Sequence, residues 1–188
     1  MTETTDEIIA LEHAYDDLTR LVSNIGIDDL AKPTNCPGWD VRALLNHTLG
    51  TATMFTLVNA GQAADEDAGD LVGNDPAAAL AQARAANLAA WRREGALDGD
   101  RTYPWGTFPA GVGLVINVSE IAVHGWDVAR ATSQAATVDA DAARIVYGLY
   151  RQMPMDGLRA HGVFGAEVEV PAAAPVQDRL LGVLGRSA

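Results

Sequence analysis

The fold is decided by the stretch Leu114-Val115-Ile116-Asn117-Val118-Ser119-Glu120-Ile121-Ala122-Val123-His124-Gly125-Trp126-Asp127-Val128. It is apolar nearly all round, and a helix that is apolar on every face lies inside a protein rather than on its surface. The stretch therefore predicts a buried helix, which we place at residues 110–132, with the other helices packed around it.

Four polar side chains interrupt the apolar surface of this helix. They are Asn117, Glu120, His124 and Asp127. Because they are three or four residues apart, they fall within roughly 80° of one another on a helix. A buried carboxylate and imidazole cost several kcal/mol unless they find partners. Glu120 and His124 project in parallel, at i and i+4, which is how a helix presents two ligands to one metal ion.

A metal ion would take a third ligand from another helix, and the remaining histidines differ in their settings. His13 lies about 170° from the apolar stripe of its segment, so it should face solvent. His161 falls in a Gly-rich segment near the C-terminus. His47 lies at the edge of an apolar helix face and is the best third candidate. Two histidines and one carboxylate leave coordination positions open, which is typical of catalytic rather than structural metal sites.

The spacing alone leaves a second interpretation open. A Glu-x-x-x-His pair is a weak motif, and Glu120 and His124 would then only be hydrogen-bonded to each other in a metal-free bundle. Facing helices of bundles are, however, where metal sites are commonly built.

The rest of the chain is also predicted to be mainly helical. Apolar residues recur at helical spacing over 6–25, 40–61, 76–94 and from 139 onward. Asp40 is a good N-cap, and Pro76 suits the first helical position. Residues 103–109 read as an irregular, aromatic-rich loop that packs against the protein.

The organisation follows from these segments. We expect an all-α fold, a four-helix bundle with an additional helix and a short irregular C-terminal tail. The bundle would occupy residues 1–156, and residues 157–188 would form an extension packed on it. Within this Gly- and Pro-rich tail, residues 166–170 are a strand candidate and residues 180–184 a last helical turn.

Composition excludes several classes of function. The 188 residues carry 13 Lys and Arg against 25 Asp and Glu, a net charge of −12, which disfavours binding to nucleic acid or to anionic membranes. Cys36 is the single cysteine, so there is no internal disulfide and no cysteine-based zinc cage. No apolar run approaches the ~20 residues of a membrane helix. Since residues 1–7 do not resemble a signal peptide, we expect a cytoplasmic protein.

Two separated segments resemble the signatures of one known family. Residues 33–47 read PTNCPGWDVRALLNH, and residues 120–127 read EIAVHGWD. They are similar to the "CPGWDV…L.H" and "E…HxWD" signatures of the DinB/YfiT-like superfamily. More narrowly, they resemble the metal-binding N-terminal domain of mycothiol-dependent maleylpyruvate isomerase. The likeness extends from about residue 6 to residue 155.

This resemblance implies a DinB-type bundle that holds a divalent metal through His47, Glu120 and His124. Zinc is the default for such a ligand set, and nickel and iron fit the same cage. Members with known activity are thiol-dependent transferases or isomerases, in which the metal activates a low-molecular-weight thiol such as mycothiol toward an electrophilic substrate. Asn117 and Asp127 are candidates to orient the ligand side chains through hydrogen bonds without binding the metal themselves. The superfamily also favours a homodimer.

Several alternatives remain open at this stage. The isomerase itself is expected to carry a substantial second domain that contributes to its active site, and only a short tail follows the bundle here. The chain is therefore either a metal-dependent thiol S-transferase or isomerase, or a non-catalytic metal-binding or ligand-sequestering bundle. Asp127 would either orient a ligand or pair with Arg42 or Arg130. With no cation beside it, Cys36 is expected to pack, and Trp39 and Trp126 are expected to lie in the core.

Overall fold

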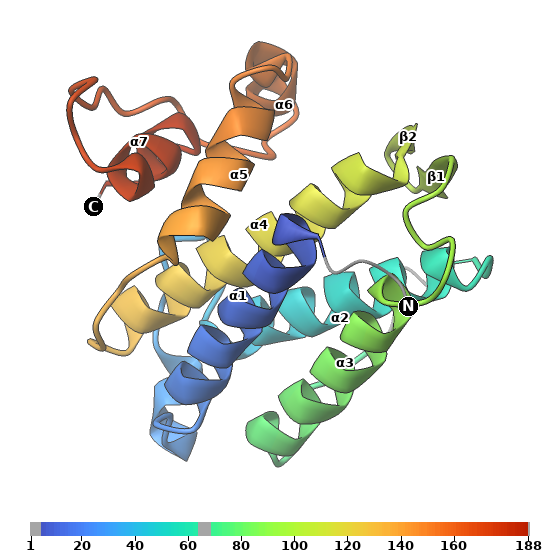
Figure 1. Cartoon of the computed structure of the whole chain (residues 1–188). Coiled ribbons are helices and arrows are strands. Elements are labelled where there is room, and N and C mark those ends of the chain that lie inside the picture. The colour runs from blue at the N-terminus through green and yellow to red at the C-terminus, as the bar shows by residue number, and fades with distance from the viewer. Residues whose placement is uncertain (1–4, 64–68, 188) are drawn as a thin grey trace.

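The computed structural model describes residues 5–63 and 69–187, and most of them are helical (Figure 1). The first four long helices are α1 (Asp6–Val22), α2 (Val41–Asn59), α3 (Pro76–Trp91) and α4 (Ala110–Ala131). Helix α1 packs along α4 and contacts α3, while α2 packs against both α3 and α4. This arrangement is the predicted four-helix bundle.

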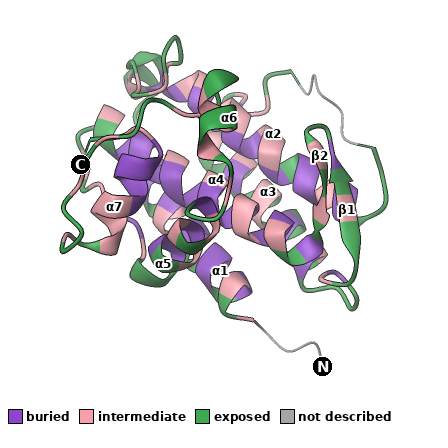
Figure 2. Ribbon diagram, turned by 90° about the horizontal axis from the view of Figure 1, so that it is seen from above, coloured by how far each residue is buried: buried purple, intermediate pink, exposed green. Residues whose placement is uncertain are grey.

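Helix α4 lies at the centre of the molecule because its side chains are apolar on nearly all faces. Leu114, Val118, Ile121 and Trp126 are all buried, and α1, α2 and α5 (Ala140–Tyr150) cover it from different sides (Figure 2). Such a helix gains free energy only when neighbours remove its whole surface from water. The stretch that predicted the fold is therefore the element around which the bundle is built.

The helix starts follow the sequence signals closely. The Asp40 carboxylate accepts a hydrogen bond from the Ala43 backbone N–H at 2.8 Å, which caps α2. Asp75 caps α3 in the same way, and Pro76 is the first residue of that helix. Both predicted starts are confirmed within one residue. Ahead of α2, a short 3-10 helix (Ile27–Ala31) was not predicted.

One part of the predicted aromatic loop is a β-hairpin instead. Strand β1 (Asp100–Tyr103) pairs antiparallel with β2 (Gly106–Pro109), with Tyr103 opposite Gly106. Tyr103 stacks on Trp105, with the ring centroids 5.6 Å apart and the planes 8° from parallel, and it also contacts Phe55 of α2. The predicted aromatic packing is present, but a tight turn with paired strands carries it.

The C-terminal region is more ordered than an irregular tail. The fifth predicted helix ends at Tyr150, and α6 (Met155–Ala160) and α7 (Val176–Val183) follow, with α7 packed against α5 (Figure 1). The strand predicted at residues 166–170 is wrong, since these residues belong to no described strand. The Val168 N–H instead donates to the Gly182 carbonyl of α7 at 2.9 Å.

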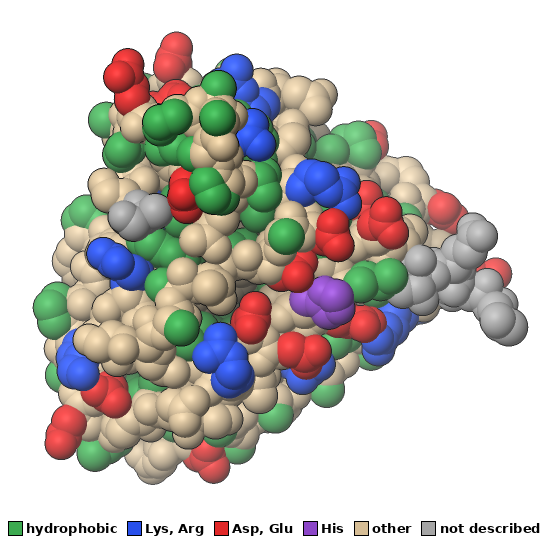
Figure 3. Space-filling view, turned by 60° about the vertical axis from the view of Figure 1, so that its left-hand side comes forward, with side chains coloured by type: hydrophobic (Ala, Val, Ile, Leu, Met, Phe, Trp, Pro, Cys, Tyr) green, Lys and Arg blue, Asp and Glu red, His purple; other side chains and the backbone are tan. Residues whose placement is uncertain are grey.

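The surface in view in Figure 3 mixes both signs of charge. Acidic and basic side chains are interspersed there rather than gathered into one large basic patch. None of the helices in the described ranges, 5–63 and 69–187, is long and apolar enough to cross a membrane.

Candidate metal centre

The packing of α2 against α4 brings the three predicted ligand residues together. His47 Nε2 lies 3.0 Å from Glu120 Oε2, and His124 Nε2 lies 3.5 Å from the same oxygen. The two imidazole rings are nearly perpendicular, with centroids 5.0 Å apart. One ligand atom from each of the three residues lies within 4.8 Å of the others, which is close enough for one ion to contact all three.

The cluster is closed on the α4 side and open at His47. The exposed fraction of the side chain is 38% for His47, 22% for Glu120 and 12% for His124. Trp39 borders the open side, with its ring 4.8 Å from the His47 ring. We expected Trp39 in the core, but it is 36% exposed; Trp126 is buried as predicted. A small molecule would therefore reach the cluster past His47 and Trp39.

Charge complementarity sets the protonation of the cluster. Burial pushes the pKa of the Glu120 carboxyl upward, but hydrogen bonds from His124 and His47 outweigh it and hold this pKa well below its ordinary value. Burial likewise lowers the pKa of His124, yet hydrogen bonds to Asp127, Cys36 and Glu120 raise it well above 6.5. A metal ion that binds His124 would therefore compete with a proton, which these neighbouring groups favour.

Asp127 contacts the ring of His124 on the side away from Glu120. Its Oδ2 lies 3.1 Å from His124 Nδ1, and its side chain is fully buried. Burial raises the pKa of Asp127, while His124 and Arg186 lower it by more, so the carboxyl stays ionised. A carboxylate behind a histidine in this way fixes which ring nitrogen faces a metal.

The cation paired with Asp127 is Arg186, which the sequence analysis did not identify. Arg186 Nε donates to Oδ1 at 2.9 Å and its terminal nitrogen donates to Oδ2 at 2.7 Å. Neither predicted alternative is seen, because Arg42 pairs with Asp70 and Arg130 lies over the Trp126 ring. Arg186 and Asp127 are 59 positions apart in the sequence, and no local pattern would have paired them.

The Asn117 side chain is hydrogen-bonded to another helix of the bundle. Its Oδ1 accepts a hydrogen bond from Trp91 Nε1 of α3 at 2.8 Å, and its side chain is buried. The residue that we expected to orient a ligand thus joins α4 to α3 inside the core.

Cys36 lies in a second cluster of metal-ligand atoms, together with His124 and Asp127. Its Sγ is 3.7 Å from Asp127 Oδ2 and 3.9 Å from the nearest Arg186 nitrogen. The expectation that no cation lies beside Cys36 is therefore wrong. The fixed positive charge of Arg186 among these atoms opposes a second metal ion, so this cluster is a hydrogen-bonded network behind His124.

The other two histidines lie apart from the cluster, as predicted. His13 is 51% exposed, with Nδ1 3.7 Å from an Asp139 oxygen. His161 is exposed and follows the last residue of α6.

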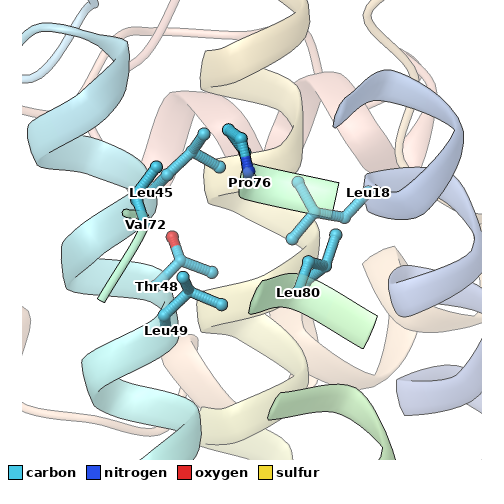
Figure 4. Close-up of a pocket in the computed structure, with 7 residues that line it drawn as sticks. All are labelled: Leu18, Leu45, Thr48, Leu49, Val72, Pro76 and Leu80. Atoms are coloured by element: carbon cyan, nitrogen blue, oxygen red, sulfur yellow. The ribbon is translucent and has the colours of Figure 1, made fainter. Parts of the chain in front are cut away.

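Two hollows in the described chain are not lined by His47, Glu120 or His124. A cavity of about 10 Å³ between α1, α2 and α3 is lined almost entirely by apolar side chains, and its one hydroxyl, on Thr48, already donates to the Leu44 carbonyl (Figure 4). A surface hollow of about 420 Å³ lies between α1 and α3, and its arginines Arg84 and Arg92 pair with carboxylates of α1. The first is a packing space, and the second is a salt-bridged groove.

The fold and the site together define this protein as a helical bundle with a candidate metal centre, made of two imidazoles and one carboxylate on facing helices. Comparison with known proteins defines the class further. Residues 11–129 match the family described as mycothiol maleylpyruvate isomerase N-terminal domain. This match spans more than half of the sequence, and the chain belongs to that family.

Two relatives and one solved structure are also similar to this chain. Uncharacterized proteins from two Mycobacterium tuberculosis strains, CDC 1551 / Oshkosh and H37Rv, are 27% identical over 184 residues, covering 97% of this chain and 98% of each relative. The crystal structure of the mycothiol-dependent maleylpyruvate isomerase superposes with a TM-score of 0.69 at 14% identity. That likeness establishes the fold, and it confirms the predicted DinB-like bundle.

The superposition also corrects one expectation. It covers 96% of this chain and 88% of the isomerase chain. The two chains are therefore similar in extent. We expected the isomerase to carry a large second domain that this chain lacks, and the 12% of the isomerase chain left uncovered is too little for one.

Proposed function

We propose that this protein binds a divalent metal ion through His47, Glu120 and His124 and acts as a thiol-dependent transferase or isomerase. The observation that carries the proposal is the convergence of the three ligand atoms within 4.8 Å on two facing helices, with one side open. Family membership supports the thiol, because the description of the matched family names mycothiol.

The residues fit a metal of the zinc type. Two imidazoles and one carboxylate suit Zn²⁺, with Ni²⁺ and Fe²⁺ as the other candidates, and three protein ligands leave room for a further one. When bound there, the metal would lower the pKa of a small thiol and present it as a thiolate at neutral pH.

The chain's own residues would supply position and access. Asp127 would keep His124 Nδ1 occupied, so that Nε2 faces Glu120 and His47. Trp39, beside His47 at the open side, would form one wall for the thiol or for its electrophilic partner. Both small molecules would enter from this side, because α4 closes the other.

The first experiment measures metal content. Protein purified without an affinity tag would be analysed by plasma mass spectrometry as wild type, His47→Ala, Glu120→Ala and the control His13→Ala. We expect a near-stoichiometric transition metal in the wild type and in His13→Ala, and its loss in the other two. Wild-type protein that holds no metal, and takes up neither added zinc nor added nickel, would overturn the proposal.

The second experiment tests the reaction. Metal-loaded protein would be assayed for loss of electrophiles in the presence of mycothiol and other small thiols, with His124→Ala as the comparison. Thiol-dependent turnover that is abolished in His124→Ala is expected. Stoichiometric metal with no turnover on any pair would instead indicate a bundle that binds or sequesters its ligand without catalysis.

A further inference from the structure

We propose that Arg186, beyond the end of α7, is a positioning residue for the candidate metal ligand His124 and acts on it through Asp127. This inference rests on the proposed function, because His124 matters as a ligand only if a metal binds. The hydrogen bonds from Arg186 to Asp127 and from Asp127 to His124 are, however, features of the protein itself.

The contact between Arg186 and Asp127 fixes the orientation of the carboxylate. Two guanidinium nitrogens donate to the two oxygens of Asp127, at 2.9 and 2.7 Å. The side chains are 12% and 0% exposed, so water does not compete for these bonds. A two-point contact from a planar guanidinium holds a carboxylate in one plane, which a single hydrogen bond cannot do.

That orientation is transmitted to the imidazole ring. Asp127 Oδ2 accepts from Arg186 and also lies 3.1 Å from His124 Nδ1. With Nδ1 held there, the opposite nitrogen of the ring faces Glu120 and His47. If Asp127 were free to rotate, it would no longer fix the orientation of the His124 ring. The three candidate ligand atoms would then spend less time in the arrangement that binds a metal ion.

The backbone of the C-terminal segment positions Arg186 beside Asp127. The Arg186 N–H donates to the Leu181 carbonyl at 2.8 Å, and Leu181 is buried in the core. Gly185 has a φ of +78°, and a Cβ there would lie 2.7 Å from the Cα of Gly165. This close turn, which favours glycine, directs the arginine back toward α4.

The competing explanation is that Arg186 only anchors the C-terminal segment, and Arg159 supplies the control. Arg159 holds the same segment by donating to the carbonyls of Val183 and Gly165 and by pairing with Glu167. None of these bonds involves Asp127. A loosened segment should therefore affect both arginine variants alike, whereas positioning through Asp127 should affect only Arg186.

The test measures Zn²⁺ affinity by competition with a chelator on the full chain. The proteins are wild type, Arg186→Gln, Arg186→Lys, Arg159→Gln, Asp127→Asn and the double variant Asp127→Asn/Arg186→Gln. We expect Arg186→Gln to weaken zinc binding by about tenfold, at the lower end of the effect of residues that support metal ligands. Arg186→Lys should recover part of the loss, and Arg159→Gln should stay close to wild type.

The double variant decides whether Arg186 acts through Asp127. If it does, Asp127→Asn/Arg186→Gln binds zinc as Asp127→Asn does, with no further loss. Additive losses, equal losses in Arg186→Gln and Arg159→Gln, or unchanged affinity in Arg186→Gln would each overturn the inference. If Arg186→Gln fails to fold, two other comparisons still test the inference. One compares the zinc affinity of Arg186→Lys with that of Arg159→Gln, and the other compares Asp127→Asn with the double variant, which keeps the net charge of the wild type.

A metal-free readout separates this inference from the proposed function. The Nδ1–H proton of His124, held by Asp127, should give a protected downfield proton resonance, assigned by its absence in His124→Gln. We expect this resonance in wild type and Arg159→Gln and its loss in Arg186→Gln. A wild type that binds no zinc but shows this pattern would refute the proposed function and retain the positioning role. A resonance unchanged in Arg186→Gln would refute the positioning role.

Discussion

Gly113 in the first turns of α4 lies directly against Tyr103 of β1. A Cβ atom on Gly113 would lie 2.0 Å from the Tyr103 hydroxyl oxygen and 2.8 Å from the ring carbon that bears it. Tyr103 is itself 3% exposed and in contact with Phe55, so the ring has little room to move. The hairpin can approach the bundle this closely because residue 113 has no side chain.

We therefore expect Gly113→Ala to lower the free energy of unfolding by about 1–3 kcal/mol, the usual cost of overpacking a core. Gly148→Ala in α5 is the control, because nothing lies within 4 Å of its added Cβ. It should gain about 0.5–1 kcal/mol from better helix propensity. Urea unfolding of the two variants checks this, and a Gly113→Ala variant as stable as Gly148→Ala would contradict the contact.

Buried tyrosines predict a loss of stability at alkaline pH. Burial raises the pKa of Tyr103 to about 12, with Arg101 lowering it slightly, and burial also raises the pKa of Tyr15 and Tyr150 above its ordinary value. Above a pH of about 10 the unfolded chain loses protons that the folded chain keeps, so stability falls as pH rises.

Urea unfolding from pH 8 to pH 11 measures this slope, together with tyrosinate absorbance of the folded protein. Tyr103→Phe should reduce the slope between about pH 10 and 11, because one of the groups that ionise only after unfolding is gone. A slope that is the same in Tyr103→Phe would show that Tyr103 ionises freely in the fold.

Asn46 on α2 secures the segment that precedes α3. Its Oδ1 accepts from the backbone N–H groups of Leu71 and Val72 at 2.8 and 3.0 Å, and its Nδ2 donates to Asp70. Asn46→Ala should cost about 1–3 kcal/mol, because both N–H groups lose their acceptor.

Hydrogen exchange gives a local check on the same variant. The amides of residues 71 and 72 should exchange faster in Asn46→Ala, while amides in the middle of α4 stay protected. Asn24→Ala is the comparison, since the Asn24 amide makes an exposed bond to the Arg20 carbonyl and its loss should cost less than about 0.5 kcal/mol. Equal stability losses in the two variants would contradict a specific role for Asn46.

Trp39 should report metal binding optically. Its ring lies 4.8 Å from the ring of the candidate ligand His47, whereas Trp105 belongs to the hairpin and contacts Phe55 and Tyr103. Addition of Ni²⁺ should change the tryptophan fluorescence of wild type and of Trp105→Phe, and most of that change should be lost in Trp39→Phe. A full response in Trp39→Phe would place the bound metal elsewhere.

The parts that the sequence could predict are those with a local signature. The buried helix and the parallel projection of Glu120 and His124 follow from spacing along one helix, and His47 follows from its place on an apolar face. The caps at Asp40 and Asp75 are also local, since each bonds a backbone N–H three residues on. These features could be predicted because residues close in sequence determine them.

The features that were missed depend on residues far apart in the chain. Arg186 finds Asp127 only after α7 has packed against α5, and no pattern in the tail marks it as a partner. Asn117 was one of the four polar residues predicted to lie together on the buried helix. Its side-chain oxygen instead accepts a hydrogen bond from Trp91 of α3 inside the core. The 36% exposure of Trp39 likewise depends on how the segment before α2 packs on the bundle, where Cys36 Sγ lies 3.7 Å from Asp127 Oδ2 of α4.

His47 and Glu120 are 73 positions apart in the sequence, and this separation also bears on the order of events during folding. Each helix can form on its own timescale, but these two side chains meet only after the intervening chain has closed into a loop, and closure costs more entropy as the loop lengthens. Contacts between distant residues slow folding compared with local ones. The pairing of His47 with Glu120 therefore depends on the docking of α2 against α4 and not on the formation of either helix alone.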